Sequence, residues 1–479
     1  MTHRLLTLLF CLLMPYELIA DDLSDDISVA LTQRSGQYTA MSQQIWQWAE
    51  LGYQETLSST LLQSHLEDSG FRIEAGVADI PTSFIATFGA GEPIIAFLAE
   101  YDALPNASQS ASPKHDPLEP GSAGHACGHN LFGVGAAAAA VSVKNWMQKS
   151  ATPTGTIRVY GTPAEEGGAG KAYMVREGLF DDVDIAIHWH PGDNNVALPG
   201  TTLANRSAKF RFQGVASHAA AAPEKGRSAL DGVEAMNHMV NMLREQVPAT
   251  TRIHYTITQG GSAPNVVPNF AESFYYVRSP SPEALLDIWK RVEDAARGAS
   301  IGTSTTVDWE VIHGTYNILP NVTLAKVMDQ SLKTFGGINY TQEEQNFAEK
   351  IVKTYLKEPR LKLGSEKTSV PFSENIVKSS GSSDVGDVSW MAPTVGVMTA
   401  TWVPGTAPHS WQSTAASGMS IGHKGMFLAA KSMALTSIKL LQNPELIEQA
   451  RREWEDRRGI DFNYEPLLGE REPALDYRQ

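Results

Sequence analysis

The sequence predicts an α/β protein with an inserted α+β unit, and two observations carry this prediction. Short apolar segments bounded by glycine or proline alternate with helical segments before residue 202, as in a mostly parallel sheet flanked by helices. Residues 203–317 then change to a strand-helix-strand-strand-helix-strand order, which is typical of a split βαβ unit. The predicted domains are therefore a main domain formed by 21–202 and 318–479, and a second domain inserted at 203–317.

Composition limits the class of ligand. The chain has 479 residues, 42% of them hydrophobic, and a formal net charge of −15. This composition excludes a disordered chain. An acidic chain without a long basic run also lacks the positive patch that binds the phosphates of nucleic acid. We therefore expect a folded protein that acts on a small molecule.

The first twenty residues predict an export signal. Arg4 precedes an apolar run over 5–14, and Ala20 ends the segment before two aspartates. The run is too short to span a membrane, so we expect a soluble protein in the periplasm or outside the cell. Cleavage after Ala20 would leave Cys127 as the single cysteine, a thiol that needs a chemical reason.

The main domain is predicted to open with two helices between residues 21 and 70, because apolar side chains recur there at helical spacing up to Gly70. The next predicted elements are strands at 83–88 and 93–98, an alanine-rich helix at 133–147, and strands at 156–160 and 183–187 separated by a helix around 171–177.

The inserted domain is predicted from alternating strands and amphipathic helices. Its strands are expected at 208–212, 253–257, 270–278 and 305–312, and its helices at 228–243 and 283–297. The polar, lysine-containing stretch 339–382 is predicted to be a surface excursion of the main domain.

Two motifs of this chain carry metal-binding side chains. Cys127 and His129 flank one glycine between a strand and a helix, so thiolate and imidazole can converge on a zinc-like ion. Glu165 and Glu166 follow a strand, and adjacent glutamates in a turn point to opposite sides. One of them can then bind a metal while the other acts as a general base.

Histidines follow two more segments. His188 and His190 lie two apart on one face of a strand end, so either could be a ligand, and His409 lies in a loop bounded by glycine and proline. Strand ends of one sheet share an edge, so these donors should meet. Five protein ligands exceed the three of a typical catalytic zinc site and indicate two ions with a bridging group, while Asp102 is expected to orient a ligand histidine.

From about Tyr38 to about Leu441 the chain resembles the co-catalytic metallo-amidohydrolase and carboxypeptidase family, which includes hippurate, auxin-conjugate and p-aminobenzoyl-glutamate hydrolases and aminoacylase-like enzymes. It looks closest to the p-aminobenzoyl-glutamate branch. The resemblance rests on the blocks AEYDALP, GHACGHN, TPAEEGG, HWHP, ASHAAAAPEKGRSALDGVEAM, PNVVPNFAE, GSSDVGDVSW and PGTAPHSWQ.

The resemblance implies a zinc-peptidase-like catalytic domain with an inserted ferredoxin-like lid that also dimerises. It implies two divalent ions per subunit, manganese or zinc, held by Cys127 as bridging ligand, His129, Glu166, His190 and His409. It further implies Glu165 as general base, His218 as an oxyanion stabiliser often supplied by the partner subunit, and Asn265 and Arg278 as holders of a substrate carboxylate.

The implied reaction is hydrolysis of the amide bond of N-acyl or N-aroyl amino acids, such as p-aminobenzoyl-glutamate-like conjugates, or of dipeptides. Three alternatives stay open. His188 could replace His190 as ligand. Cys127 could be the nucleophile of a thiol hydrolase with His129 or His409 as its base. The fold could also serve a periplasmic binding protein without turnover.

Overall fold

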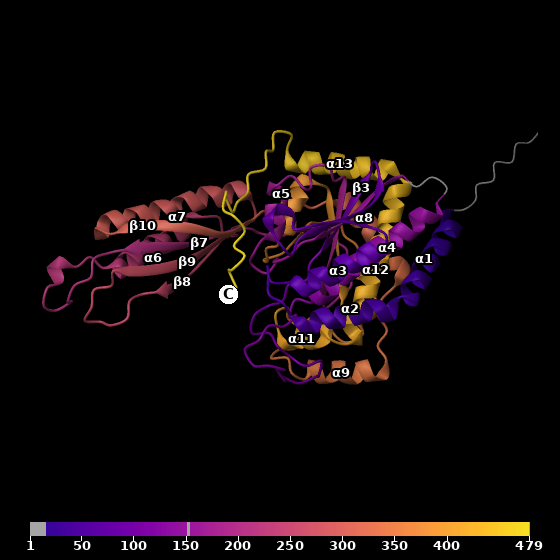
Figure 1. The fold of residues 1–479 in the computed structure, drawn as a ribbon, viewed down its shortest axis with the longest axis horizontal. Coiled ribbons are helices and arrows are strands. Elements are labelled where there is room, and N and C mark those ends of the chain that lie inside the picture. The colour runs from indigo at the N-terminus through magenta and orange to yellow at the C-terminus, as the bar shows by residue number, and fades with distance from the viewer. Residues whose placement is uncertain (1–15, 151–153, 479) are drawn as a thin grey trace, which may run out of the picture.

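The structure, a computed structural model, describes residues 16–150 and 154–478, with side chains from Leu23 onward. Figure 1 shows a main domain in which helices surround a sheet, and a narrow lid, residues 204–315, that projects from it. Residues 1–15 of the predicted export signal lie outside the described residues. Within the described part of the chain, no helix is long and apolar enough to cross a membrane.

The main domain is built on a six-stranded sheet in the order β1-β2-β4-β3-β5-β12. The neighbours β4, β3, β5 and β12 are parallel to one another, and β2 is antiparallel to both of its neighbours, β1 and β4. This confirms the predicted mostly parallel α/β sheet. The strands are β1 (Arg72–Ala75), β2 (Phe84–Ala90), β3 (Ile94–Ala99), β4 (Gly155–Gly161), β5 (Ile185–Gly192) and β12 (Thr394–Ala400).

Helices cover both faces of this sheet (Figure 1). The prediction of two opening helices was wrong, because three are present. The additional helix, α1, buries only a stripe with a spacing of four residues, Leu23, Ile27 and Leu31, which is a weak sequence signal. The helices up to the lid are α1 (Tyr16–Gln33), α2 (Ser35–Trp48), α3 (Thr56–Asp68), α4 (His129–Lys149) and α5 (Gly170–Arg176).

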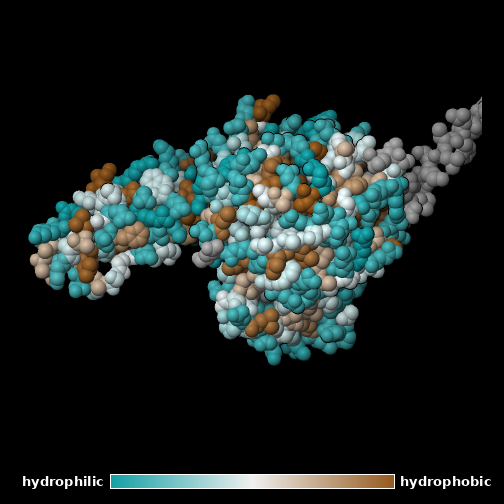
Figure 2. Space-filling view, in the orientation of Figure 1, coloured by the Kyte–Doolittle hydropathy of each residue, from teal (hydrophilic) through white to brown (hydrophobic). Residues whose placement is uncertain are grey.

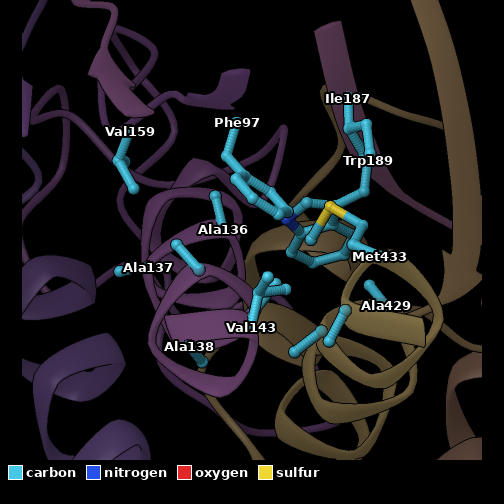
Figure 3. Packing of buried hydrophobic residues seen from close by; sticks show 14 of the residues in the cluster. Phe97, Ala136, Ala137, Ala138, Val143, Val159, Ile187, Trp189, Ala429 and Met433 are labelled. Atoms are coloured by element: carbon cyan, nitrogen blue, oxygen red, sulfur yellow. The ribbon is translucent and has the colours of Figure 1, made fainter. Parts of the chain in front are cut away.

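The alanine-rich helix α4 lies against the sheet at short range. Figure 3 shows Trp189 of β5 packed between the alanines of α4 and the residues Ala429 and Met433 of α12. A side chain at Gly135 would meet the Trp189 ring at 2.9 Å, and Trp189 donates a hydrogen bond to the Phe132 carbonyl. The small residues of α4 therefore bring its N-terminus, with His129, close to the sheet edge.

The lid is a four-stranded antiparallel sheet in the order β10-β7-β9-β8 with two helices packed on one face. This order and the alternation of its elements confirm the predicted ferredoxin-like unit. The lid elements are β7 (Ala204–Gln213), α6 (Ala229–Leu243), β8 (Arg252–Gln259), β9 (Phe270–Ser279), α7 (Pro282–Thr303) and β10 (Thr306–Thr315).

The main domain resumes after the lid. The stretch 339–382, predicted as a surface excursion, contains the short strand β11 and the helix α9, whose Phe347 and Ile351 are buried beside Trp402. Most residues of this stretch are exposed or half-buried, so it lies at the surface as predicted, and one face of α9 packs onto the main domain. The remaining elements are α8 (Val322–Phe335), α9 (Gln342–Val352), β11 (Val377–Lys378), which pairs with β6 (Gly200–Thr201), α10 (Val385–Met391), α11 (Trp411–Ser417), α12 (Ser420–Gln442) and α13 (Pro444–Arg458).

Candidate active site

The predicted site residues of the main domain meet at one edge of its sheet. Asp102 follows β3, Glu165 and Glu166 follow β4, and His190 lies near the end of β5. Because β3, β4, β5 and β12 are parallel, their carboxyl ends form a common edge. His409 in the loop after β12, and Cys127 and His129 at the start of α4, complete the cluster.

Two groups of three donors share the Cys127 thiol. In one group, ligand atoms of Cys127, His129 and His190 lie within 4.8 Å of one another. In the other, ligand atoms of Cys127, Glu166 and His409 lie within the same distance. A third group joins His129 to the carboxylates of Glu100 and Glu165.

Hydrogen bonds at Nδ1 orient the rings of His129 and His190, so that Nε2 of each ring faces the cluster. His129 Nδ1 lies 2.8 Å from Asp102 Oδ1, and His190 Nδ1 lies 2.7 Å from the Pro191 carbonyl oxygen. Both acceptors place a proton on Nδ1, so Nε2 is the nitrogen that presents a lone pair whenever the ring is neutral. His190 Nε2 accordingly lies 3.5 Å from Cys127 Sγ.

Three buried polar atoms of the donor groups have no hydrogen-bond partner, namely His129 Nε2, Glu100 Oε2 and Glu166 Oε1. His129 Nε2 lies 3.2 Å from Glu100 Oε2, and Glu166 Oε1 lies 3.2 Å from His409 Nε2, both within ion-pair range. Buried polar atoms are otherwise satisfied in folded proteins, so their convergence fits a cation. Thiolate, imidazole and carboxylate together suit zinc-like and manganese-like ions.

The backbone around the cluster allows this approach. Gly128 has φ +78°, and a side chain there would meet Pro191 at 2.8 Å, so glycine lets Cys127 reach His190. His409 is held in a left-handed conformation with φ +57°, and its amide donates to the Ala126 carbonyl. Such a conformation is costly for a non-glycine residue and is typical of functional sites.

Glu165 and His129 are electrostatically perturbed by their neighbours. Burial, together with the carboxylates of Glu100 and Glu166, raises the pKa of Glu165 well above its usual value. Burial alone would lower the pKa of His129, but the neighbouring Cys127, Asp102 and Glu100 outweigh burial and raise it. The accumulated negative charge at this edge is what bound cations would neutralise.

His188 occupies a different position from His190. It belongs to neither group of donors that contains Cys127, and it lines a cavity beneath the lid attachment. Burial lowers the pKa of His188 to about 3, so the ring is neutral. The geometry thus favours His190 over His188 as a donor to the cluster.

A buried charge network beside the cluster was missed in the sequence. Lys171 Nζ lies 2.7 Å from both Glu100 Oε1 and Asp384 Oδ1, and all three side chains are almost fully buried. Glu100 and Asp384 lie inside the blocks AEYDALP and GSSDVGDVSW, so the sequence carried a signal for both carboxylates. Lys171 gave none, because an isolated lysine on a short helix is usually exposed.

The three lid residues do not reach the cluster within this chain. His218 and Asn265 lie side by side beyond the far end of β7, because the Ala219 amide donates to the Asn265 carbonyl. β7 has ten residues and so spans roughly 30 Å from its attachment. Arg278 instead lies opposite Asn205 at the attached end, so the structure separates it from Asn265.

Comparison with known proteins agrees with this geometry. The model of peptidase family M20/M25/M40 matches residues 96–358. The chain is 40% identical to one subunit of the p-aminobenzoyl-glutamate hydrolase of Escherichia coli, over 90% of this chain and 93% of that protein. It is 32% identical to the mouse Xaa-Arg dipeptidase, over 87% of this chain and 88% of that one.

Solved structures share the fold at lower identity. An aminobenzoyl-glutamate utilization protein from Klebsiella pneumoniae superposes with a TM-score of 0.59 at 16% identity, over 86% of this chain and 98% of that one. A dinuclear metal-binding peptidase of Bacillus subtilis, YXEP, gives a TM-score of 0.58 at 18% identity, over 86% and 99%. The family match covers more than half of the chain, and the chain is therefore a hydrolase that belongs to peptidase family M20/M25/M40.

Proposed function

We propose that this enzyme is a metal-dependent amidohydrolase that cleaves N-aroyl or N-acyl amino acids of the p-aminobenzoyl-glutamate type, with dipeptides as a secondary substrate class. The observation that carries the proposal is the convergence of the two donor groups on Cys127 beside Glu165. The similarity to the E. coli p-aminobenzoyl-glutamate hydrolase and to Xaa-Arg dipeptidase supports the choice of an amide bond next to an amino acid.

The metal-binding roles follow from the two donor groups. His129 and His190 would hold one divalent ion, Glu166 and His409 the other, and Cys127 would bridge them. When bound, two manganese or zinc ions supply the Lewis acid that activates water and the scissile carbonyl. Asp102 orients His129 through the bond to Nδ1.

Glu165 is the proposed general base. It lies beside the donor groups without belonging to either group that contains Cys127, so it is free to accept a proton from water. A carboxylate whose pKa is raised by burial and by neighbouring carboxylates can then pass that proton to the leaving amine. Cations bound nearby would lower the pKa of Glu165 and favour its proton-accepting form.

A cavity of about 240 Å³ beside His190 supports an aromatic or bulky apolar acyl group. Its wall is mostly apolar and includes Leu198, Ile318 and Met398, with the neutral ring of His188 at its side. An apolar cavity of roughly 150 Å³ is enough to hold benzene, so a benzoyl-sized group fits here. The lid sheet and helices contribute nothing to this wall.

We further propose that His218 acts on the site of a second subunit. His218 Nδ1 accepts hydrogen bonds from the amides of Ala220 and Ala221, so Nε2 carries the proton and can donate to an oxyanion. Asn265 lies beside it, and Arg278 would hold a substrate carboxylate near the attached end of the lid.

Dimerisation through the lid is supported by its surface. Hydrophobic residues are exposed toward its free end (Figure 2), and β8 is an edge strand of the lid sheet. A two-fold arrangement that joins lids would cover these groups and carry His218 to the opposite main domain. Among the described lid residues, the exposed large apolar residues are Val215, Met239, Met242, Ile257, Val266, Leu286 and Ile301.

Two properties of the cellular context belong to this proposal. The export signal predicted over residues 1–20 would place the enzyme in the periplasm or outside the cell, where it meets conjugates from the surroundings. The E. coli relative is named as one subunit of a hydrolase, and the other named subunit of that hydrolase is itself 29% identical to this chain over 238 residues. A homologous second subunit is therefore an alternative to the homodimer.

The test is release of free amino acid by the purified protein from benzoyl-glycine, p-aminobenzoyl-glutamate, acetyl-amino acids and dipeptides. We expect turnover with manganese or zinc, loss after chelation, and preference for aroyl over acetyl substrates. A thiol hydrolase would survive chelation and lose activity on alkylation of Cys127. Bound metal without turnover of any substrate, alone or with a homologous subunit, would favour a binding protein.

A further inference from the structure

The last eighteen described residues, Asp461–Arg478, form an extended segment that we name the C-terminal strap. After α13 the strap runs back between the lid and the main domain and ends near the cluster edge (Figure 1). It lies outside the family match at 96–358, so the family comparison says nothing of its role.

The strap is anchored first at the attachment of the lid. Tyr464 donates to the buried carboxylate of Asp387 at 2.7 Å, and Tyr316 donates to the Glu465 carbonyl at 2.9 Å. The backbone of Leu467 and Leu468 then crosses Gly314 so closely that a side chain there would meet it at 2.3 Å. Both leucines are 2% exposed.

The middle of the strap contacts both domains. Arg471 donates to the carbonyls of Val311 and Ile312 in the lid strand β10. Arg176 of the main domain donates in turn to the Arg471 carbonyl at 2.7 Å. The strap therefore arrives at the cluster edge in a fixed direction.

Its end reaches the loop 162–169, which carries Glu165 and Glu166. Tyr477 Oη lies 3.2 Å and Arg478 Nη2 2.5 Å from the Glu166 carbonyl oxygen, and both groups donate to it. Among the described residues, no other donor reaches this oxygen. The Tyr477 ring also packs edge-on against Tyr53, which itself donates to the Gly168 carbonyl of the same loop.

This loop needs external support because its backbone is strained. Ala164 and Ala169 both have left-handed φ values, +58° and +60°. Such a conformation is unfavourable for a non-glycine residue and persists only where its surroundings fix it. Glu55 and Asp102 fix two loop amides, those of Ala164 and Glu166, and the strap fixes the carbonyl side of Glu166.

We propose that Tyr477 and Arg478 are positioning residues, which hold the Glu165–Glu166 loop in its working conformation through the Glu166 carbonyl. The proposal rests on the proposed function for the roles of Glu165 and Glu166. The restraint of this loop by the end of the strap does not depend on any substrate.

The test compares full-length variants by hydrogen–deuterium exchange and by kinetics. In the double variant Tyr477→Phe/Arg478→Ala, we expect amides of 162–169 to exchange about tenfold faster or more, while peptides of α4 and α12 are unchanged. Asp476→Ala is the matched control, because the Asp476 side chain is exposed and makes no hydrogen bond or ion pair with the described residues. The conservative single variant Arg478→Lys is expected to keep most of the protection of the parent protein at 162–169.

On a hydrolysed substrate, we expect the double variant to lose about tenfold in kcat with little change in KM, since loop geometry and not substrate affinity is altered. Exchange of 162–169 equal to that of the Asp476→Ala control would overturn the proposal. So would faster exchange spread across the whole main domain, which indicates general stabilisation only. If no substrate is turned over, the proposed function fails and the exchange result still decides the role of the strap.

Discussion

The cluster edge of the main domain and the free end of the lid differ in the burial and bonding of their functional side chains. At the cluster edge, His129 and Asp102 are fully buried and bonded to each other at 2.8 Å. At the free end of the lid, His218 and Asn265 are exposed, and the His218 ring is bonded only to amides of its own turn among the described residues. Segments of this chain assemble and bury the first region, whereas the side chains of the second region are exposed.

The largest expected effect separates two neighbours at the cluster edge. Glu165→Gln removes the proposed base but no proposed ligand, so kcat should fall by up to about 10⁴-fold while bound manganese or zinc stays unchanged. Glu166→Gln alters a donor beside Cys127 and should lower both metal content and kcat. Metal analysis beside initial rates checks both variants. Equal loss of metal in the two would show that Glu165 is a ligand and not the base.

The second prediction concerns stability, and contrasts a buried ion network with an exposed pair of the lid. Lys171→Met leaves the buried carboxylates of Glu100 and Asp384 without their cation and should lower the free energy of unfolding by about 3–5 kcal/mol. Arg297→Ala removes partly exposed pairs with Asp294 and Glu293 and a contact with the Trp309 ring, and should cost about 1 kcal/mol. Denaturant midpoints measure both, and similar losses for the two variants would contradict the contrast.

The third prediction tests whether the free end of the lid serves a second subunit. His218→Ala should lower kcat by about 10²–10³-fold with unchanged metal content, because one oxyanion donor is lost. Mixing subunits of His218→Ala with subunits of Glu165→Gln should then restore activity, since a mixed dimer holds one site with both groups intact. If His218 serves its own subunit, no mixture regains activity, because each subunit lacks one of the two groups.

The same contrast explains what could be predicted from the sequence. The structure brings Cys127, His129, Glu166 and His409 into one cluster, as expected, because strand ends of a parallel sheet must share an edge. Element positions in the lid followed from alternating polarity. They agree with the structure within a few residues, apart from longer strands at the lid attachment and the helix α7, which ends six residues later than predicted, at Thr303. Local periodicity and connection rules are enough for these features.

Features that depend on tertiary surroundings were not predicted. Lys171 has a charged side chain, and its full burial depends on ion pairs with Glu100 and Asp384, which come from distant segments. The contact of Tyr477 and Arg478 with the Glu166 carbonyl joins segments more than 300 residues apart and involves a backbone atom, which leaves no pattern in the sequence. The helix α1 was missed because acidic residues hide its single apolar stripe.

The smallest expected effect compares a buried histidine of the main domain with an exposed one of the lid. Burial lowers the pKa of His423 in α12 to about 4. Between pH 6.5 and 4 the unfolded chain therefore binds a proton that the folded chain does not, so this contribution to stability is present above pH 6.5 and is lost as the pH falls. At pH 5 the loss amounts to about 2 kcal/mol.

His423→Leu should remove this loss, so that the free energy of unfolding decreases less between pH 7.5 and pH 5 than in the parent protein. Leucine is of similar size, and no hydrogen bond to His423 Nε2 is broken. His238→Leu on the exposed face of α6 is the matched control and should keep the parent difference. An unchanged difference in His423→Leu would show that water reaches this ring, and that the main domain is less closed there than its packing indicates.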